Sequence, residues 1–308
     1  MNVLVVLPSV LTVPHLEVIA AARTLGSVTA LVVGDPDLAM LARHGVPRVL
    51  VPEMPPTTEP AAVADAAVAA VEASRPDAVL LVSSFAGKAV AGRLAVLLDC
   101  GAVTDVTGLR VEDGVVVASK PVLQGSWATE CAVTRGPAVI AVRPTAFEAR
   151  EEPGGTPEVV TLPVTPGAAA RAVTVEAREA RPASGRPPLE EARVVVAGGR
   201  GTDGDFTLVE ELADALGGAV GATRVATDEG WIDHAAQIGQ TGVTISPRLY
   251  VGLGISGAIH HTAALQGAET IVVVNSDPDA RIFGMADFGV VGDLREVLPT
   301  AIAALRGT

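Results

Sequence analysis

The chain has 308 residues, of which 49% are hydrophobic and only 3% aromatic, and its formal net charge is −13. This length is enough for about two domains with sizeable cores. The acidic balance excludes a strong general affinity for nucleic acids or anionic membranes. Valine, alanine and leucine supply most of the apolar residues, which is typical of buried parallel strands flanked by alanine-rich helices.

The first apolar run, Val3–Leu7, is too short for a secretion signal and has no basic flank, so it is interpreted as a strand. The most apolar longer stretch, residues 78–102, is interrupted by charged side chains and is not expected to span a bilayer. Cys100 and Cys131 lack metal-ligand spacing and are expected to be buried, reduced thiols. We therefore expect a soluble, cytoplasmic protein.

In the first half of the chain, apolar runs of strand length alternate with segments of helical period. This alternation predicts a parallel α/β sheet. From residue 103 to residue 142 the pattern changes to short β-rich pieces around glycine-rich turns, and we expect these to extend the edge of the same sheet. The predicted strands are Val3–Leu7, Ala30–Val33, Arg48–Val51 and Val79–Val82, and the predicted helices are His15–Leu25, Ala61–Ala73 and Gly87–Leu98.

Residues 176–192 are polar, proline-rich and densely charged. Such a segment cannot bury enough apolar surface to pack by itself, so we interpret it as a linker. It would join an N-terminal α/β domain, residues 1–175, to a C-terminal domain, residues 193–308, where a second α/β alternation begins.

At the start of this second domain, a strand-like run leads into the turn Gly199-x-Gly201-x-x-Gly204 and then into a helical segment, Phe206–Leu216. This order matches the dinucleotide-binding fingerprint. The motif alone is weak, because a glycine-rich connection without a ligand has the same appearance. Arg200 lies inside the turn, where a cation favours a phosphate ligand.

Polar residues follow later strands at the carboxyl edge of the predicted sheet, the usual ligand position in open α/β folds. Arg224 follows one short apolar run, and Asn275 follows another. The loop 237–242 supplies amides and a hydroxyl that can hydrogen-bond the edge of a heteroaromatic ring, although an ordinary turn can have the same composition. Asp293 either contacts a ligand or caps the final helix, 294–305.

Residues 249–275 predict a strand, a tight turn, an amphipathic helix and a second strand. The turn Gly254–Gly257 would present backbone N–H groups at a helix N-terminus, where an anion is favoured. His260 and His261 are adjacent on the predicted helix, so they cannot form a metal pair, and at most one is expected to face the sheet edge. No nucleophile with a base and no paired carboxylates stand out, which indicates ligand binding rather than catalysis.

Together these motifs resemble the electron-transfer flavoprotein alpha subunit, most closely through residues 193–308. The N-terminal part resembles the family more thinly, at residues 85–95, 104–107 and 142–147. The resemblance implies two α/β domains: an N-terminal parallel-sheet domain that packs against a partner subunit, and a C-terminal doubly wound, Rossmann-like domain that binds FAD. The partner implied is the electron-transfer flavoprotein beta subunit, which would carry AMP or a second flavin.

The resemblance also implies which residues hold FAD. Arg224 would lie against the isoalloxazine ring, where its charge favours reduced, anionic flavin, and Thr241 would lie near flavin N5. Ser256 would contact the pyrophosphate, His261 the pyrimidine edge, and Asn275 and Asp293 the adenosine half. His260 stands where glutamine is usual, which leaves open which of the two histidines faces the flavin. The implied set is Arg200, Thr223, Arg224, Gln237, Gln240, Thr241, Gly254, Ser256, Gly257, His261, Asn275 and Asp293, with no catalytic residue and no metal ligand.

The leading hypothesis is therefore an electron carrier that takes electrons from flavin dehydrogenases and passes them singly to a downstream acceptor. An NAD(P)-dependent dehydrogenase that uses Gly199-x-Gly201-x-x-Gly204, with Arg224 selecting a 2′-phosphate, is the alternative. The absence of a recognisable catalytic dyad disfavours it. A third hypothesis is an assembly subunit that has lost its cofactor, which the retained motif residues disfavour.

Overall fold

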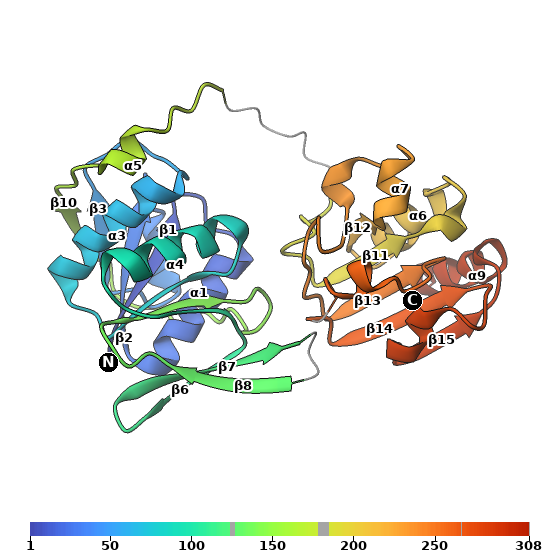
Figure 1. Ribbon diagram of the computed structural model, residues 1–308, viewed down its shortest axis with the longest axis horizontal. Helices are drawn as coiled ribbons and strands as arrows, with labels where there is room; N and C mark the ends of the chain where they lie inside the picture. Colours follow the sequence, from blue (N-terminus) through green and yellow to red (C-terminus); the bar gives the residue numbers. More distant parts are fainter. Residues whose placement is uncertain (124–126, 178–184, 266, 308) are drawn as a thin grey trace. The chain divides into compact units, whose positions relative to one another are not determined.

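The computed structural model describes residues 1–123, 127–177, 185–265 and 267–307. The chain divides into two compact units, Met1–Glu179 and Ala180–Thr308. Each is an α/β unit built on a parallel sheet, which confirms the predicted fold class (Figure 1). Part of the predicted linker, residues 178–184, lies outside the described residues. Within the rest of it, Leu189 and Ala192 are buried in the core of the second unit.

The sheet of the N-terminal unit has seven strands, and every pairing between neighbours is parallel. All residues from Val3 to Leu7 of its central strand are buried, because helices cover both faces of the sheet. In spatial order the strands are β10 (Glu158–Leu162), β3 (Arg48–Pro52), β2 (Ser27–Val33), β1 (Asn2–Pro8), β4 (Ala78–Val82), β9 (Ala138–Val142) and β5 (Ala102–Val106).

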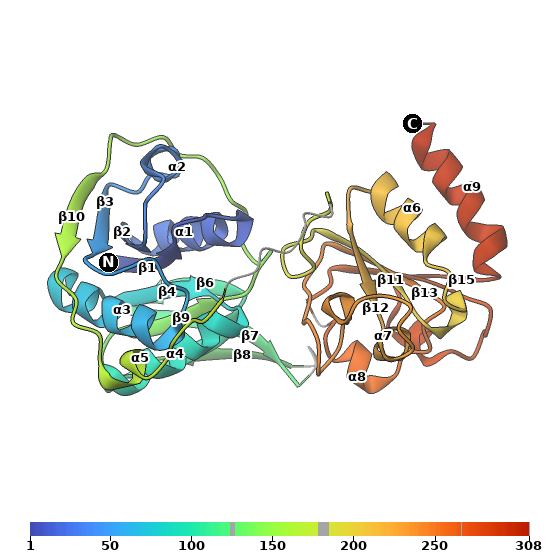
Figure 2. The same ribbon diagram turned by 90° about the horizontal axis from the view of Figure 1, so that it is seen from above.

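Helices cover this sheet from two sides, with α1 on one face and α3 and α4 on the other (Figure 2). The alanines of α3, such as Ala64 and Ala67, are fully buried and let this helix approach the sheet closely. Ser84 caps α4 by accepting a hydrogen bond from the Gly87 N–H group. The helices are α1 (Val13–Leu25), α2 (Leu38–Arg43), α3 (Pro60–Ser74), α4 (Phe85–Leu97) and α5 (Ala168–Arg171).

The region 103–142 corrects one expectation. Only β5 and β9 extend the parallel sheet, whereas β6 (Gly108–Glu112), β7 (Val115–Val122) and β8 (Trp127–Ala132) form a separate antiparallel sheet. The reason lies in the turn between β6 and β7, where Asp113 and Gly114 both have positive φ, at 50° and 79°. Asp-Gly is the preferred pair for such a two-residue hairpin turn, so the sequence did hold a signal for this sheet.

The C-terminal unit is doubly wound around a five-stranded sheet whose neighbours all pair in parallel. Helices α6 (Thr207–Ala215) and α9 (Leu294–Arg306) cover one face, and α8 (Ile259–Thr262) lies on the other side (Figure 2). In spatial order the strands are β12 (Ala219–Ala222), β11 (Val194–Gly198), β13 (Leu249–Leu253), β14 (Thr270–Asn275) and β15 (Phe288–Val291); the remaining elements are η1 (Arg200–Thr202), α7 (Arg224–Asp228), η2 (His234–Ala236) and η3 (Arg281–Met285).

The topology of this unit creates a switch point. From β11 the chain passes to the neighbouring β12 on one side, and from β13 it passes to the neighbouring β14 on the other side, so the connections after the adjacent strands β11 and β13 lead in opposite directions. In open α/β sheets this arrangement opens a crevice at the carboxyl ends of the strands, and ligands bind there.

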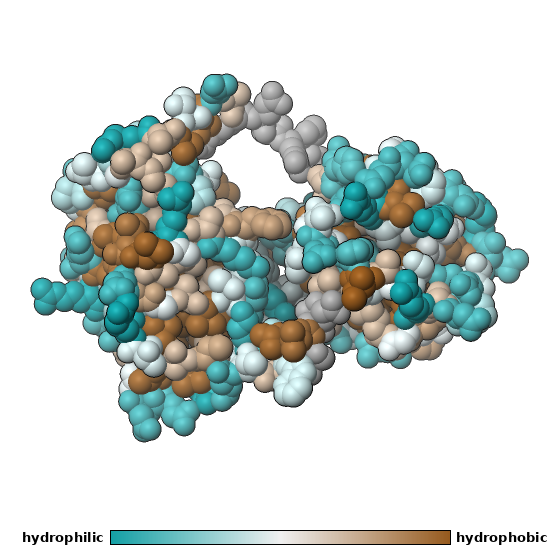
Figure 3. All heavy atoms as spheres, in the orientation of Figure 1, coloured by the Kyte–Doolittle hydropathy of each residue, from teal (hydrophilic) through white to brown (hydrophobic). Residues whose placement is uncertain are grey.

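The surface carries hydrophobic residues as well as hydrophilic ones (Figure 3). In the N-terminal unit, Val10, Phe85 and Val96 are each more than two-thirds exposed. Cys100 and Cys131 are free and only half-buried, so the expectation that both are buried was wrong. Across the described residues, no helix has both the length and the apolar character needed to cross a membrane.

Candidate functional site

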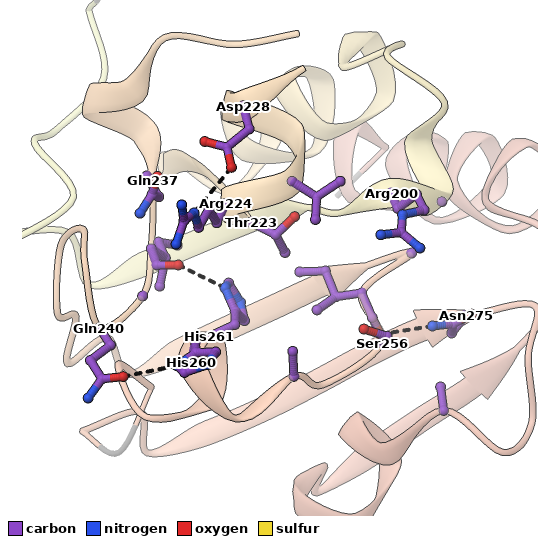
Figure 4. Close-up of a pocket in the computed structure, with 18 of the residues that line it drawn as sticks. Arg200, Thr223, Arg224, Asp228, Gln237, Gln240, Ser256, His260, His261 and Asn275 are labelled. Carbon is purple, nitrogen blue, oxygen red and sulfur yellow. Dashed lines mark hydrogen bonds and ion pairs between the residues drawn. The ribbon is translucent and has the colours of Figure 1, made fainter. Parts of the chain in front are cut away.

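A cavity of about 720 Å³ opens at the carboxyl edge of the C-terminal sheet (Figure 4). Its lining comes from segments that follow four neighbouring strands: Arg200 after β11, Thr223 after β12, Gly254 after β13, and Asn275 at the end of β14. The cavity therefore occupies the switch point of the fold. Its volume lies in the range of small-molecule and cofactor sites.

The structure brings together ten of the twelve residues predicted to hold FAD. Gly257 and Asp293 lie outside the cavity lining. Gly257 has φ of +82°, and a Cβ atom on it would lie 2.4 Å from the Ile282 nitrogen, so it shapes the turn. Asp293 caps α9 by accepting a hydrogen bond from the Arg295 N–H group at 2.7 Å. The lining residues are Arg200, Thr223, Arg224, Gln237, Gln240, Thr241, Gly254, Ser256, His261 and Asn275.

The turn that follows β11 is hydrogen-bonded to the turn that follows β13, and both turns line the cavity. The Gly199 and Gly201 N–H groups donate to the carbonyl groups of Leu253 and Gly254, each at 2.9 Å. The turn continues as the short 3₁₀ helix η1, and α6 does not begin until Thr207. A dinucleotide fingerprint instead directs these N–H groups, at the start of a helix, toward the pyrophosphate. The geometry therefore argues against the dehydrogenase alternative.

Two arginines on separate elements line the cavity. Arg200 lies on η1 and Arg224 begins α7 (Figure 4). The Arg224 Nε atom lies 3.1 Å from a carboxylate oxygen of Asp228, one helical turn later, and both side chains are at least half exposed. Such an exposed pair contributes little to stability. Asp228 was missed by the sequence analysis, although its i, i+4 spacing from Arg224 was a usable signal.

His261 is buried and its ring has two protein partners. Its Nδ1 atom lies 3.0 Å from the Ile238 carbonyl oxygen, and its Nε2 atom lies 2.7 Å from the Tyr250 hydroxyl. The neutral ring satisfies both contacts, because Nδ1–H donates to the carbonyl while Nε2 accepts the tyrosine proton. Burial lowers the pKa of His261 to about 4. Tyr250, the only tyrosine of the chain, was missed because its strand is otherwise apolar.

His260 is exposed, and its Nδ1 atom lies 2.9 Å from the Gln240 side-chain oxygen. Both histidines line the cavity, so the expectation that at most one faces the sheet edge was wrong. The reason is that α8 has only four residues and lies at the cavity rim, where adjacent residues both reach the cavity. A helix this short also supplies little dipole, so the positive charge at this cavity comes mainly from the two arginines.

We expect the C-terminal unit to lose stability as the pH falls from about 6.5 to about 4. An unfolded histidine takes up a proton near pH 6.5, whereas folded His261, with its pKa of about 4, does not. Protonation in this window therefore favours the unfolded chain, by at most about 3 kcal/mol. Urea unfolding, followed by Trp231 fluorescence in a Trp127→Phe background, measures this loss. His261→Gln should flatten the pH dependence, and an unchanged slope would contradict the assignment.

Comparisons with known proteins cover most of the chain. The family model "Electron transfer flavoprotein domain" matches residues 8–167, and the model "Electron transfer flavoprotein FAD-binding domain" matches residues 188–266. The electron transfer flavoprotein subunit alpha of Mycobacterium leprae is 44% identical over 292 residues, which cover 92% of this chain and 90% of that protein. The chain belongs to the electron transfer flavoprotein alpha subunit family.

Two further relatives show the breadth of the match. The alpha subunit of Bacillus subtilis is 36% identical over 297 residues, which cover 92% of this chain and 90% of the relative. The mitochondrial alpha subunit of Dictyostelium discoideum is 39% identical over 228 residues, which cover 71% of this chain and 63% of the relative. The resemblance inferred from the motifs is thus confirmed for this alpha subunit, and its C-terminal unit is an FAD-binding domain of the family.

The cavity of this alpha subunit fits the chemistry of FAD. Arg200 and Ser256 offer a cation and a hydroxyl to a diphosphate, while Gln240 and Thr241 offer polar groups to a ring edge. Ile255 adds an apolar wall. Among residues 1–123, 127–177, 185–265 and 267–307, no cluster of three or more His, Cys, Asp or Glu side chains could hold a metal ion.

Proposed function

We propose that this chain is the FAD-binding alpha subunit of a cytoplasmic, two-subunit electron carrier. It accepts electrons from flavin dehydrogenases and passes them singly to a downstream acceptor. The observation that carries this proposal is the cavity at the switch point, where two arginines and a loop rich in amides and hydroxyls converge in a chain of this family.

In this proposal each group in the cavity has a part in binding. Arg200 and Ser256 hold the diphosphate, and Arg224 and Thr241 face the flavin ring. When bound, FAD supplies the electron-carrying chemistry, and the chain supplies binding, orientation and charge. Asn275 acts mainly on the protein, because its Nδ2 donates to the Ile255 carbonyl at 2.8 Å and its Oδ1 accepts from the Asp277 N–H group at 3.0 Å. It fixes the turns that border the adenosine end.

The partner in this proposal is the electron-transfer flavoprotein beta subunit, carrying AMP or a second flavin. The exposed apolar side chains of the N-terminal unit, among them Val10, Phe85 and Val96, support an extensive partner contact. Expressed alone, the chain is expected to aggregate or to elute as mixed oligomers in size-exclusion chromatography. Co-expression with the beta subunit should give a single heterodimer peak. A monodisperse, fully flavinated alpha monomer would contradict obligate pairing.

An anaerobic titration of the heterodimer with a chemical reductant tests the carrier function. A carrier that passes electrons singly should take them up in two separable one-electron steps. A protein that is instead reduced by NAD(P)H in one two-electron step, and binds no FAD, would support the dehydrogenase alternative.

A further inference from the structure

A buried row of polar side chains connects α7 to the cavity. The Thr227 hydroxyl oxygen lies 2.9 Å from the Arg224 carbonyl oxygen and 3.0 Å from the Gln237 Oε1 atom. The Gln237 Nε2 atom in turn lies 2.9 Å from the Thr241 hydroxyl oxygen. Thr227 and Gln237 are only 2% and 6% exposed, whereas Thr241 is exposed and lines the cavity. The row therefore runs from the protein interior to the cavity.

The protons of this row can be arranged in two complete patterns. The Thr227 hydroxyl has one proton and two acceptors within reach. In the first pattern it donates to Gln237 Oε1, and the Gln237 amide N–H donates to Thr241. The Thr241 proton is then free to point into the cavity.

In the second pattern the Thr227 proton goes to the Arg224 carbonyl oxygen. The Gln237 amide turns by half a rotation, so that its N–H donates to the Thr227 oxygen and its carbonyl accepts the Thr241 proton. Thr241 then presents a lone pair to the cavity. A carboxamide has nearly the same shape at its oxygen and nitrogen ends, so the turn requires no repacking of the buried neighbours.

We propose that Thr227 and Gln237 form a reversible hydrogen-bond relay, which sets whether the Thr241 proton points into the cavity, to donate to the ligand, or toward Gln237, so that Thr241 accepts from the ligand. This inference rests on the proposed function, because a flavin is a ligand that needs both. Its ring nitrogens accept hydrogen bonds in the oxidised state, and gain hydrogen on reduction. Thr227 touches no ligand in this arrangement, so it is a positioning residue that acts through Gln237 and Thr241.

The simpler role for Thr227 is purely local, because threonine in a helix often donates to the carbonyl group one turn back. The two roles differ in what reduction does. A local bond is indifferent to the redox state of the ligand. Oxidised flavin, whose ring nitrogen accepts a hydrogen bond, matches the first pattern, in which Thr227 makes one hydrogen bond of the relay. Reduced flavin, whose N–H donates, matches the second pattern, in which Thr227 makes two. Removing the Thr227 hydroxyl therefore weakens binding of reduced FAD more than binding of oxidised FAD.

The test compares Thr227→Val, which keeps the shape and loses the hydroxyl, with Thr227→Ser, which keeps the hydroxyl. For each heterodimer we measure the affinity for oxidised FAD by reconstitution and the midpoint potential by spectroelectrochemistry. In Thr227→Val the ratio of reduced to oxidised FAD affinity should fall roughly threefold to tenfold, as expected for one hydrogen bond. In Thr227→Ser it should stay within about twofold of the wild-type ratio, the scatter expected of a conserved hydrogen bond.

A flavinated Thr227→Val heterodimer with an unchanged ratio would overturn the relay and leave the proposed function intact. A wild-type heterodimer that takes up no FAD would overturn both. A second measurement looks for the relay in the wild-type protein itself and uses a variant only to identify the band. With isotopically labelled glutamine, the infrared difference spectrum between oxidised and reduced heterodimer should contain a shifted Gln237 amide band that is absent in Gln237→Leu. No such band would overturn the relay.

Discussion

Gly254→Ala should destabilise the C-terminal unit by roughly 3 kcal/mol or more and abolish FAD retention. Gly254 has φ of +62°, which side-chain-bearing residues rarely adopt. A Cβ atom there would lie 2.7 Å from the Gly201 Cα atom and 2.9 Å from its carbonyl carbon. Both are backbone atoms of the turn that carries Arg200, so they cannot move away as a flexible side chain would. The hydrogen bonds between the two turns would have to break.

Gly217→Ala is a matched control, because Gly217 has the same φ of +62° and a Cβ atom there would meet nothing within 4 Å. Gly217→Ala should cost only about 1 kcal/mol, from backbone strain alone. Urea unfolding followed by Trp231 fluorescence in the Trp127→Phe background measures both variants. The difference between them isolates the contact with Gly201. Equal stability of the two variants would show that Gly254 is not packed against Gly201 as described.

Arg224→Ala should lower the flavin midpoint potential while leaving the fold intact. The substitution removes a cation from the cavity and leaves Asp228, its ion-pair partner, without compensation. Reduced, anionic flavin then loses about 1–3 kcal/mol of stabilisation relative to oxidised flavin. This corresponds to roughly a tenfold to hundredfold change in the redox equilibrium. The unfolding free energy should change by less than about 1 kcal/mol, because the pair is exposed.

Two further variants separate charge from shape. Arg224→Lys keeps the positive charge and should retain most of the potential. Asp228→Asn removes the opposing negative charge and should raise the potential. Spectroelectrochemistry of the three variants and the wild-type heterodimer gives the comparison. An unchanged flavin potential in Arg224→Ala, or a fall in Arg224→Lys equal to that in Arg224→Ala, would show that the charge of Arg224 does not set the potential.

The sequence predicted the features that depend on local period and composition. Strand β3 agrees with the predicted run Arg48–Val51 to within one residue, and α1, α3, α4 and α9 lie within a few residues of their predicted limits. Polar residues at strand ends, such as Arg200, Arg224 and Asn275, converge at one cavity because parallel strands share a carboxyl edge. These predictions required only the period of the apolar residues and the position of the turns.

Features that depend on contacts distant in sequence were not predicted. The partnership of Tyr250 with His261 and the reach of Gln237 to Thr227 join segments whose spacing carries no period. The hydrogen bond from the Gly201 N–H group to the Gly254 carbonyl group likewise joins two turns that follow different strands. Asp293 shows the limit of residue type as a signal, because an aspartate before a helix serves equally as a cap or as a ligand contact. The structure shows the cap.

The visible absorption spectrum of this chain, purified together with its beta subunit, tests the central claim most directly. The FAD content is read from the cofactor released on denaturation, in the wild-type heterodimer and in Gly254→Ala. We predict a yellow wild-type heterodimer that holds FAD in proportion to the alpha chain, and a colourless Gly254→Ala heterodimer. A colourless wild-type heterodimer that takes up no added FAD would contradict the assignment of the cavity.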